Sequence, residues 1–372
     1  MMSYEDLVQL RRRTNGSRML SVYLPGSAPD PALRETAEVL FEAGLSRIRH
    51  ALAEASHDER EVFLAAAEHA AAWLRGSAVA RQSAGVAVFA DALGVRHAGA
   101  LLEEPPTVVD WKDGIVIAPY LRTAALARPA IVTLIDSRSA RLFRYREGHL
   151  ESIEQMAAEI HTEPPIHMGD APRPPFHHGV HGTTGTDETE RREAAAFDRM
   201  LGNLMHRLEA LVQGDAWLIV GGMPQSAHKL VASLPRGFAS RLQIVNALTV
   251  TSTEAEISSA ASDAVAELLR RRDGVLVELV LDRGKAGGRA SLGWQQTLVA
   301  LEERAASEVL VSAHVAERTP DRADAVATLA MDGGAHVEVV PGDGADRLDA
   351  ESEGVAAELR FPLPFAALPL IN

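Results

Sequence analysis

The stretch from residue 161 to residue 185 constrains the fold more than any other part of the sequence. It reads HTEPPIHMGDAPRPPFHHGVHGTTG and holds five of the chain's 14 histidines, with five prolines and four glycines. Proline lacks the N–H that a helix or a central strand needs, and glycine permits backbone angles that other residues resist. We therefore expect an irregular loop over residues 161–186, between a strand and a long helix. Loops far longer than about 4–6 residues are usually functional or disordered, and we interpret this one as a functional loop on a rigid base.

The bulk composition predicts a globular protein with more than one core. The chain has 372 residues, which suits two or three domains, with 47% hydrophobic and 24% charged residues. No apolar run approaches the roughly 18 residues of a membrane span, and the first residues contain no apolar signal core. The sequence has no cysteine, which excludes disulfides and Cys-based chemistry. We expect a cytoplasmic protein with no membrane partner.

The net charge of −14 is unevenly distributed along the chain. Residues 1–127 carry 13 basic and 16 acidic groups (−3), residues 128–258 carry 13 and 16 (−3), and residues 259–372 carry 11 and 19 (−8). The acidic C-terminal end disfavours phosphate and favours a protein partner. Arginine clusters in the first two thirds remain available for local contact with RNA.

Apolar periodicity predicts an α/β protein with three domains. Residues 1–127 mix helices and strands, which indicates an α+β N-terminal domain. Residues 128–258 open with two strands joined by a short turn and continue through the long loop into a helix, as a middle domain. Residues 259–372 alternate helix and strand, which is typical of a small α/β sandwich.

Three local patterns lead to more specific expectations. Residues 114–118 are predicted to form a strand. Residues 275–281, VLVELVL, fit a strand by their branched side chains and a helix by their place in the alternation. The run Arg270-Arg271-Arg272 is interpreted as basic residues that satisfy the C-terminus of a helix.

Three separated stretches carry a family resemblance. They are residues 7–26 (LVQLRRRTNGSRMLSVYLPG), residues 130–151 (AIVTLIDSRSARLFRYREGHLE) and residues 281–312 (LDRGKAGGRASLGWQQTLVALEERAASEVLVS). In this order and spacing they resemble the archaeo-eukaryotic peptide-release factor and Pelota family, and most of all its bacterial branch of Balon-like ribosome hibernation factors. The resemblance implies a three-domain architecture whose C-terminal domain is akin to ribosomal protein L7Ae.

The sequence departs from this family at the residues that perform termination. Release factors of the family carry Gly-Gly-Gln in the middle-domain loop, but residues 161–185 contain no glutamine, and the nearest are Gln155 and Gln213. The run GGMPQ over residues 221–225 mimics the motif, but we interpret it as the end of a strand and a turn. The stop-codon motif Asn-Ile-Lys-Ser is also missing from residues 1–127, whose one lysine is Lys112.

Candidate RNA-binding residues follow from the loop and from arginine clusters. Imidazole and phenyl rings stack on bases, arginines pair with phosphates, and glycines permit close backbone approach. The candidates are Arg11, Arg12, Arg13, Arg18, Arg173, Phe176, His177, His178, Gly179, His181, Gly182, Arg191 and Arg192. The alternatives are a solvated helix end for the N-terminal arginines, pairing with neighbouring glutamates for Arg191 and Arg192, and a disordered surface loop.

Other chemistry is weakly indicated. His177, His178 and His181 lie on no regular element that fixes their spacing, with Asp170 as the nearby carboxylate, so no metal site is assigned to them. Residues 284–288, GKAGG, lack the spacing of a phosphate-binding loop. A strand bearing Arg141, Arg144 and Arg146 is interpreted either as an RNA-facing surface or as plain strand alternation. We expect no cofactor and assign no catalytic residue.

Together the resemblance and its departures imply a translation factor that occupies the ribosomal A site, in hibernation or rescue, without Gly-Gly-Gln hydrolysis. Its expected partners are rRNA of the decoding and peptidyl-transferase centres, and elongation factor Tu or another translational GTPase. One alternative is a peptidyl-tRNA hydrolase or release factor that uses a loop histidine. Another is a non-ribosomal binding module with a release-factor fold.

Overall fold

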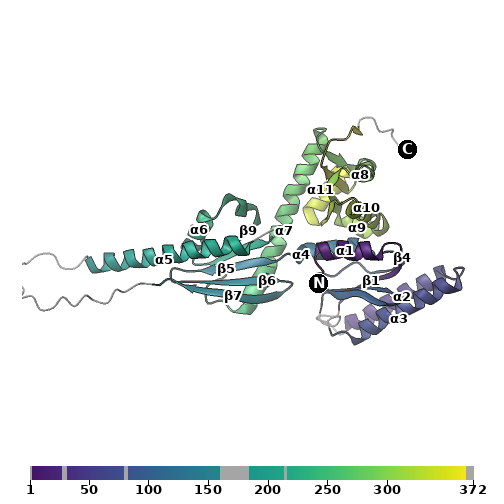
Figure 1. Cartoon of the computed structure of the whole chain (residues 1–372), viewed down its shortest axis with the longest axis horizontal. Coiled ribbons are helices and arrows are strands. Elements are labelled where there is room, and N and C mark those ends of the chain that lie inside the picture. Colours follow the sequence, from purple (N-terminus) through teal and green to yellow (C-terminus); the bar gives the residue numbers. More distant parts are fainter. Residues whose placement is uncertain (1, 27–31, 79–82, 160–183, 213–215, 366–372) are drawn as a thin grey trace, which may run out of the picture. The chain divides into compact units, whose positions relative to one another are not determined.

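The computed structural model describes residues 2–26, 32–78, 83–159, 184–212 and 216–365. The chain forms two compact units, one of residues 1–127 with residues 269–372 and one of residues 128–268 (Figure 1). The expected α/β class is confirmed, because sheets and helices alternate in both units. The division into three domains stays a prediction.

The N-terminal part of the first unit is an antiparallel sheet between two pairs of helices. Its strands are β1 (Arg18–Pro25), β2 (Gly85–Asp91), β3 (Gly94–Leu101) and β4 (Val108–Asp113), in the order β3-β2-β1-β4. Alternation along β1 sends Leu20 and Val22 into a core with α2 (Ala32–Ala51) and α3 (His57–Gly76). It sends Met19 and Tyr23 to the opposite core, with α1 (Tyr4–Thr14) and α4 (Ala118–Leu126).

The predicted strand over residues 114–118 is wrong. β4 lies just before it, and its pairing with β1 ends where Arg18 faces Asp113. Gly114 adopts a φ of +75°, which turns the chain out of the extended conformation. Ile115 and Ile117 are buried, but they lead into α4 instead of pairing with a neighbouring strand.

The C-terminal part of the first unit is a three-layer sandwich, as expected. Its strands are β10 (Ala290–Leu292), β11 (Ala306–Ser312), β12 (His336–Val340) and β13 (Val355–Leu359), in the order β10-β13-β11-β12. Leu310 and Val340 face a core with α7 (Glu254–Lys285) and α11 (Gly342–Ser352). Val309 and Val311 face the opposite core, with α8 (Gly293–Glu302) and α10 (Pro320–Asp332), while the short α9 (Ala313–Arg318) follows β11.

Helix α7 resolves the ambiguous run at residues 275–281. Val277, Val280 and Leu281 are fully buried at helical spacing, so helical packing prevails over the strand preference of their branched side chains. The interpretation of Arg270, Arg271 and Arg272 as a helix C-terminus is wrong, because α7 continues to Lys285.

The N- and C-terminal parts of the first unit share one core. Leu7 and Leu10 of α1 and Tyr120 of α4 belong to the same buried cluster as Val309 and Val337 of the C-terminal sheet. Polar contacts add to this core. The phenol of Tyr4 donates to the Ala335 carbonyl at 3.3 Å and accepts from the Val337 amide at 3.1 Å. The buried Asp324 forms an ion pair with the partly exposed Lys112.

The second unit is a mixed sheet in the order β7-β6-β5-β8-β9. Its elements are β5 (Ala130–Ile135), β6 (Ser139–Arg146), β7 (His149–Ala157), α5 (Thr184–Leu211), β8 (Trp217–Gly222), α6 (Pro224–Ser233), the 3₁₀ helix η2 (Arg236–Arg241) and β9 (Leu242–Val245). β8 pairs in parallel with both β5 and β9. α5 and α6 cover one face through Phe197, Leu204, Leu208 and Leu230.

Candidate functional site

The long loop connects β7 to α5 in the second unit. β7 ends at Ala157, and α5 begins at Thr184, slightly before the predicted end of the loop. The candidate residues Arg173, Phe176, His177, His178, Gly179, His181 and Gly182 lie outside the described residues. The described part of this region is therefore the base of the loop, formed by the end of β7 and the first turns of α5.

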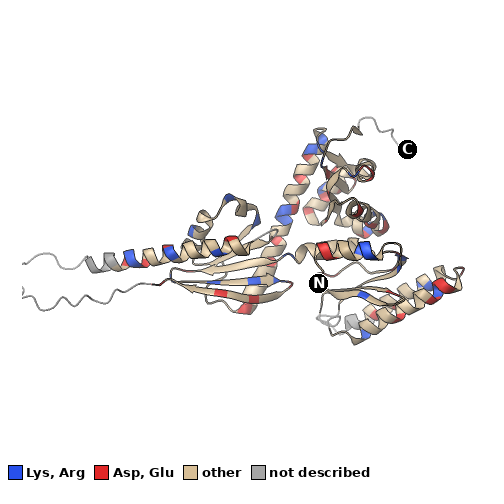
Figure 2. Cartoon of the chain, in the orientation of Figure 1, with Lys and Arg blue, Asp and Glu red and all other residues tan. Residues whose placement is uncertain are grey.

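The first turns of α5 carry Arg191 and Arg192, both exposed. Basic and acidic residues alternate along this helix (Figure 2). Beside it, at the carboxyl ends of β5 and β8, lies an open groove of about 350 Å³. Ser137, Arg138, Glu193, Phe197, Gln225 and Lys229 are among the residues that line it. In open α/β sheets this edge is the usual position of ligand sites, so the base of the loop combines a groove with exposed arginines.

The Gly221-Gly222 pair is explained by packing. Gly222 adopts a φ of +116°, and a Cβ placed there would lie 2.0 Å from the carbonyl oxygen of Ile135 on the adjacent strand β5. The Gly222 amide donates to the Leu248 carbonyl at 2.8 Å. Gln225 lies in the first turn of α6. The interpretation of this run as a strand end and turn is confirmed, since its glycines allow two backbones to approach closely.

The N-terminal arginines fall into three environments. Arg11 is 7% exposed, and its guanidinium lies 3.4 Å from Asp332 of α10. Arg12 and Arg13 are exposed in the last turn of α1. Arg18 lies 2.8 Å from Glu59 in an ion pair. Arg11 therefore serves the shared core, while Arg12 and Arg13 present their charge to solvent.

The arginines of β6 contact a ring, a backbone carbonyl and two glutamates within the second unit. The guanidinium of Arg141 lies 4.8 Å from the centre of the Phe143 ring and donates to the Val250 carbonyl at 2.8 Å. Arg144 lies 3.1 Å from Glu151, and Arg146 3.2 Å from Glu147. Intramolecular contacts account for this strand, and we assign it no role in RNA binding.

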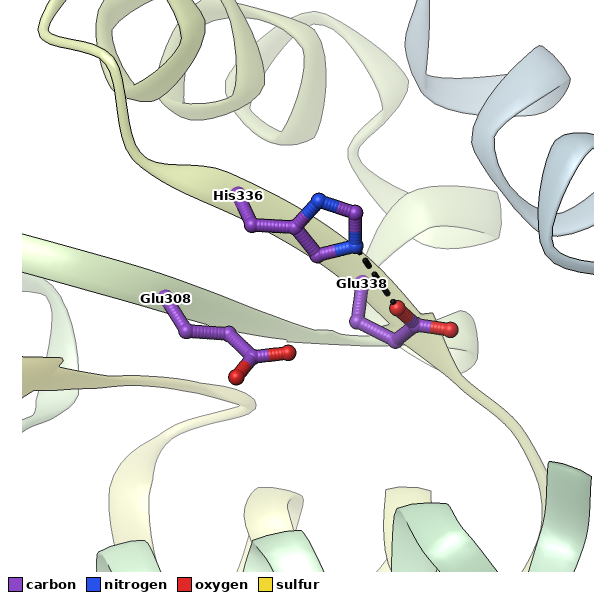
Figure 3. A group of neighbouring side chains, drawn as sticks. All are labelled: Glu308, His336 and Glu338. Atoms are coloured by element: carbon purple, nitrogen blue, oxygen red, sulfur yellow. Dashed lines mark hydrogen bonds and ion pairs between the residues drawn. The ribbon is translucent and has the colours of Figure 1, made fainter. Parts of the chain in front are cut away.

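A cluster of ionisable side chains lies in the first unit, and no sequence pattern predicted it. Glu308 of β11 and His336 and Glu338 of β12 project together (Figure 3), and Arg272 of α7 lies 3.1 Å from each glutamate. Burial raises the pKa of Glu308, against the opposing effect of the Arg272 guanidinium. The one available sequence signal was the alternation His-Val-Glu over residues 336–338, which places two polar side chains on one face of a buried strand.

Comparison with protein families places the middle of the chain among release-factor-like proteins. Residues 116–270 match the model of bacterial archaeo-eukaryotic release factor family 10. This region thus resembles the bacterial branch of the archaeo-eukaryotic release-factor family, and the resemblance that the sequence stretches predict is confirmed. The match includes the loop, its base and the whole sheet of the second unit.

Three solved structures are among those that match the chain. Pelota from Archaeoglobus fulgidus matches at 16% identity over 64% of this chain and 66% of its own, with a TM-score of 0.36. The archaeal translation termination factor aRF1 matches at 16% identity over 97% and 99%, with a TM-score of 0.28. Dom34 of S. cerevisiae, a translation termination-like factor, matches at 12% identity over 66% and 66%, with a TM-score of 0.40. None of the curated proteins matches the sequence.

Proposed function

We propose that this protein is a cytoplasmic, ribosome-associated translation factor that occupies the A site in hibernation or rescue. The family match over residues 116–270 carries the proposal, because it covers the sheet and the helix that bear the loop. None of the described helices is long and apolar enough to cross a membrane.

The composition of the loop favours occupancy of the site over peptide release. Residues 161–185 contain no glutamine, and the Gly-Gly pair at residues 221 and 222 is required where β8 passes β5. Gln225 belongs to α6 and lines the groove at the base of the loop. A factor without the Gly-Gly-Gln tripeptide at the loop tip has lost the group that positions water in the family's release factors. The ribosome is then a binding partner instead of a reaction centre.

In this proposal each part of the chain has its own partner. The N-terminal part faces the decoding centre, and the loop reaches toward the peptidyl-transferase centre. The C-terminal region, residues 259–372, carries a net charge of −8, which suits a protein partner such as elongation factor Tu better than RNA.

Co-sedimentation with vacant 70S ribosomes tests the proposal. The wild-type chain is expected to pellet with ribosomes at physiological salt and to be displaced by A-site tRNA. A variant that lacks residues 165–184 separates the contribution of the loop from that of the folded units. Absence of ribosome binding, with and without elongation factor Tu, would refute the proposal and leave a non-ribosomal binding module with this fold.

Arg12 and Arg13 provide a sharper test, because they are exposed and close together on α1. If both contact rRNA phosphates, Arg12→Glu/Arg13→Glu is expected to reduce the steepness of log K for ribosome binding against log salt by about 1.4–1.8, since each phosphate contact contributes about 0.7–0.9. Arg60→Glu, an exposed arginine on α3, is the matched control and is expected to leave the slope unchanged. Equal slopes for the double variant and the control would remove α1 from the interface.

The second candidate function is a peptidyl-tRNA hydrolase, which the five loop histidines favour as general bases near neutral pH. It requires single-turnover release of peptide from ribosome-bound peptidyl-tRNA by the wild-type protein. His178→Ala or His181→Ala would abolish that release while ribosome binding persists. No release by the bound wild-type protein excludes the hydrolase.

A further inference from the structure

Glu308, His336 and Glu338 converge on one face of the C-terminal sheet (Figure 3). β11 and β12 are parallel, and Glu308 pairs in register with His336. His336 and Glu338 are two positions apart on β12, so both side chains leave the same face. One ligand atom from each residue lies within 4.8 Å of the other two, and His336 Nε2 lies 3.2 Å from Glu338 Oε2. Two paired strands, and not loops, place these three groups.

The cluster is partly shielded from solvent and rich in negative charge. The side chain of Glu338 is 2% exposed, that of Glu308 18% and that of His336 33%. Arg272 contributes a guanidinium, and Asp273 adds a third carboxylate 3.6 Å from it. The carboxylates of Glu308, Glu338 and Asp273 all lie within 3.6 Å of the Arg272 guanidinium. Buried charge is tolerated where it is paired or coordinates a metal, so this cluster favours an additional cation.

We propose that Glu308, His336 and Glu338 bind a divalent transition-metal ion. Imidazole nitrogen and carboxylate oxygen bind Zn²⁺ at about 2.0–2.2 Å, whereas Ca²⁺ and Mg²⁺ prefer oxygen ligands alone. Such bonds put neighbouring ligand atoms about 3.0–3.5 Å apart. The contact between His336 and Glu338 already has this length, and a rotamer change of Glu308 closes the third side. A water molecule completes the coordination, since the exposed part of His336 opens the cluster to solvent.

Arg272 competes with the ion. Its Nη1 lies 3.1 Å from Glu338 Oε2 and its Nη2 3.1 Å from Glu308 Oε1, so the guanidinium bridges the carboxylates that the metal would bridge. The Arg272 side chain is 25% exposed and can turn toward solvent. Metal binding therefore exchanges an ion pair for coordination bonds. Arg272→Met removes the competitor and is expected to tighten binding.

Calorimetric titration of the full chain with Zn²⁺ tests the site. To exclude any Zn²⁺ binding by the five histidines of residues 161–185, the titration is performed in a background where they are replaced by asparagine. Those positions are His161, His167, His177, His178 and His181. One ion per chain is expected to remain. His336→Asn weakens its binding at least about 100-fold, because even partners outside the ligand set cost about 10–100-fold. Glu308→Gln weakens it in the same direction.

A matched control distinguishes Zn²⁺ binding at this cluster from Zn²⁺ binding at other histidines of the chain. His314 lies 3.0 Å from Asp349 in the same unit, as another histidine beside a carboxylate, so His314→Asn is expected to leave the affinity unchanged. Co²⁺ provides an independent readout, through visible absorption bands that His336→Asn removes. If His336→Asn does not fold, as circular dichroism reports, the half-buried Glu308→Gln supplies the comparison.

Three results would overturn the proposal. One is loss of all Zn²⁺ binding once the loop histidines are replaced. Another is an unchanged affinity in His336→Asn or Glu308→Gln. The third is binding that begins only after Arg272→Met, which would show that the guanidinium is the permanent occupant of the cluster. Each outcome is independent of ribosome binding, so this site and the proposed function fail separately.

Discussion

Replacing Asp324 tests how the N- and C-terminal parts of the first unit hold together. Its Oδ1 accepts from the Ile117 amide at 2.5 Å and the Ala118 amide at 3.1 Å, and its Oδ2 binds Lys112. Ile117 is the N-cap of α4 and offers no side-chain cap, so Asp324 provides the cap from a distant part of the chain. Its side chain is 3% exposed, against 34% for Lys112.

The expected cost of Asp324→Ala is about 2–6 kcal/mol, because it leaves the Ile117 and Ala118 amides without their acceptor at about 1–3 kcal/mol each. Asp324→Asn keeps an acceptor oxygen for the amides and loses the charge, so we expect about 1–3 kcal/mol. Urea denaturation followed by circular dichroism measures both losses. Asp321→Ala, an exposed acid in the first turn of the same helix, is the control and is expected to cost about 0.3–1 kcal/mol. Equal losses for Asp324→Ala and Asp321→Ala would refute the reasoning.

Two further predictions concern backbone packing and pH. Gly222→Ala places a Cβ 2.0 Å from the Ile135 carbonyl at a φ of +116°, so we expect a loss of about 2–4 kcal/mol in denaturant; Gly202→Ala, in open space on α5, is the control and should not destabilise. Burial lowers the pKa of His97 below 6.5. The unfolded chain then binds the proton more readily, so stability is fully present above pH 6.5 and declines as the pH falls. His97→Gln is expected to flatten that decline, and parallel stability curves between about pH 7 and pH 5 would contradict it.

The distinct environments of Arg11, Arg12 and Arg13 were predictable from helical spacing. Leu7, Leu10, Arg11 and Thr14 follow the i, i+3, i+4, i+7 pattern of one helix face, and all four are buried. We grouped the three arginines by their adjacency in sequence, although adjacent residues on a helix point in different directions. The periodicity alone separates one structural arginine from two that face solvent.

Other features could not be predicted because they depend on tertiary contacts. The run at residues 275–281 has branched side chains that suit a strand, and only the packing of Val277 and Val280 against β11 and β12 favours the helix. Likewise, the sequence around Asp324 shows an acidic residue on a helix and gives no sign of the amides it caps more than 200 positions earlier. Local sequence patterns do not identify contacts between residues so far apart in the chain.

The cluster of Glu308, His336 and Glu338 could be predicted in part from local periodicity and depends in part on tertiary contacts. Alternation on β12 already places His336 and Glu338 on one face, but only the register with β11 brings Glu308 opposite them. The cluster also adjoins α1, because the ring centres of Tyr4 and His336 lie 4.1 Å apart. An ion that fixes His336 would therefore also fix the surface on which α1 rests. Since a ligand that binds one arrangement stabilises it, metal binding and the docking of α1 would be linked, and Tyr4→Ala should weaken Zn²⁺ binding without removing a ligand.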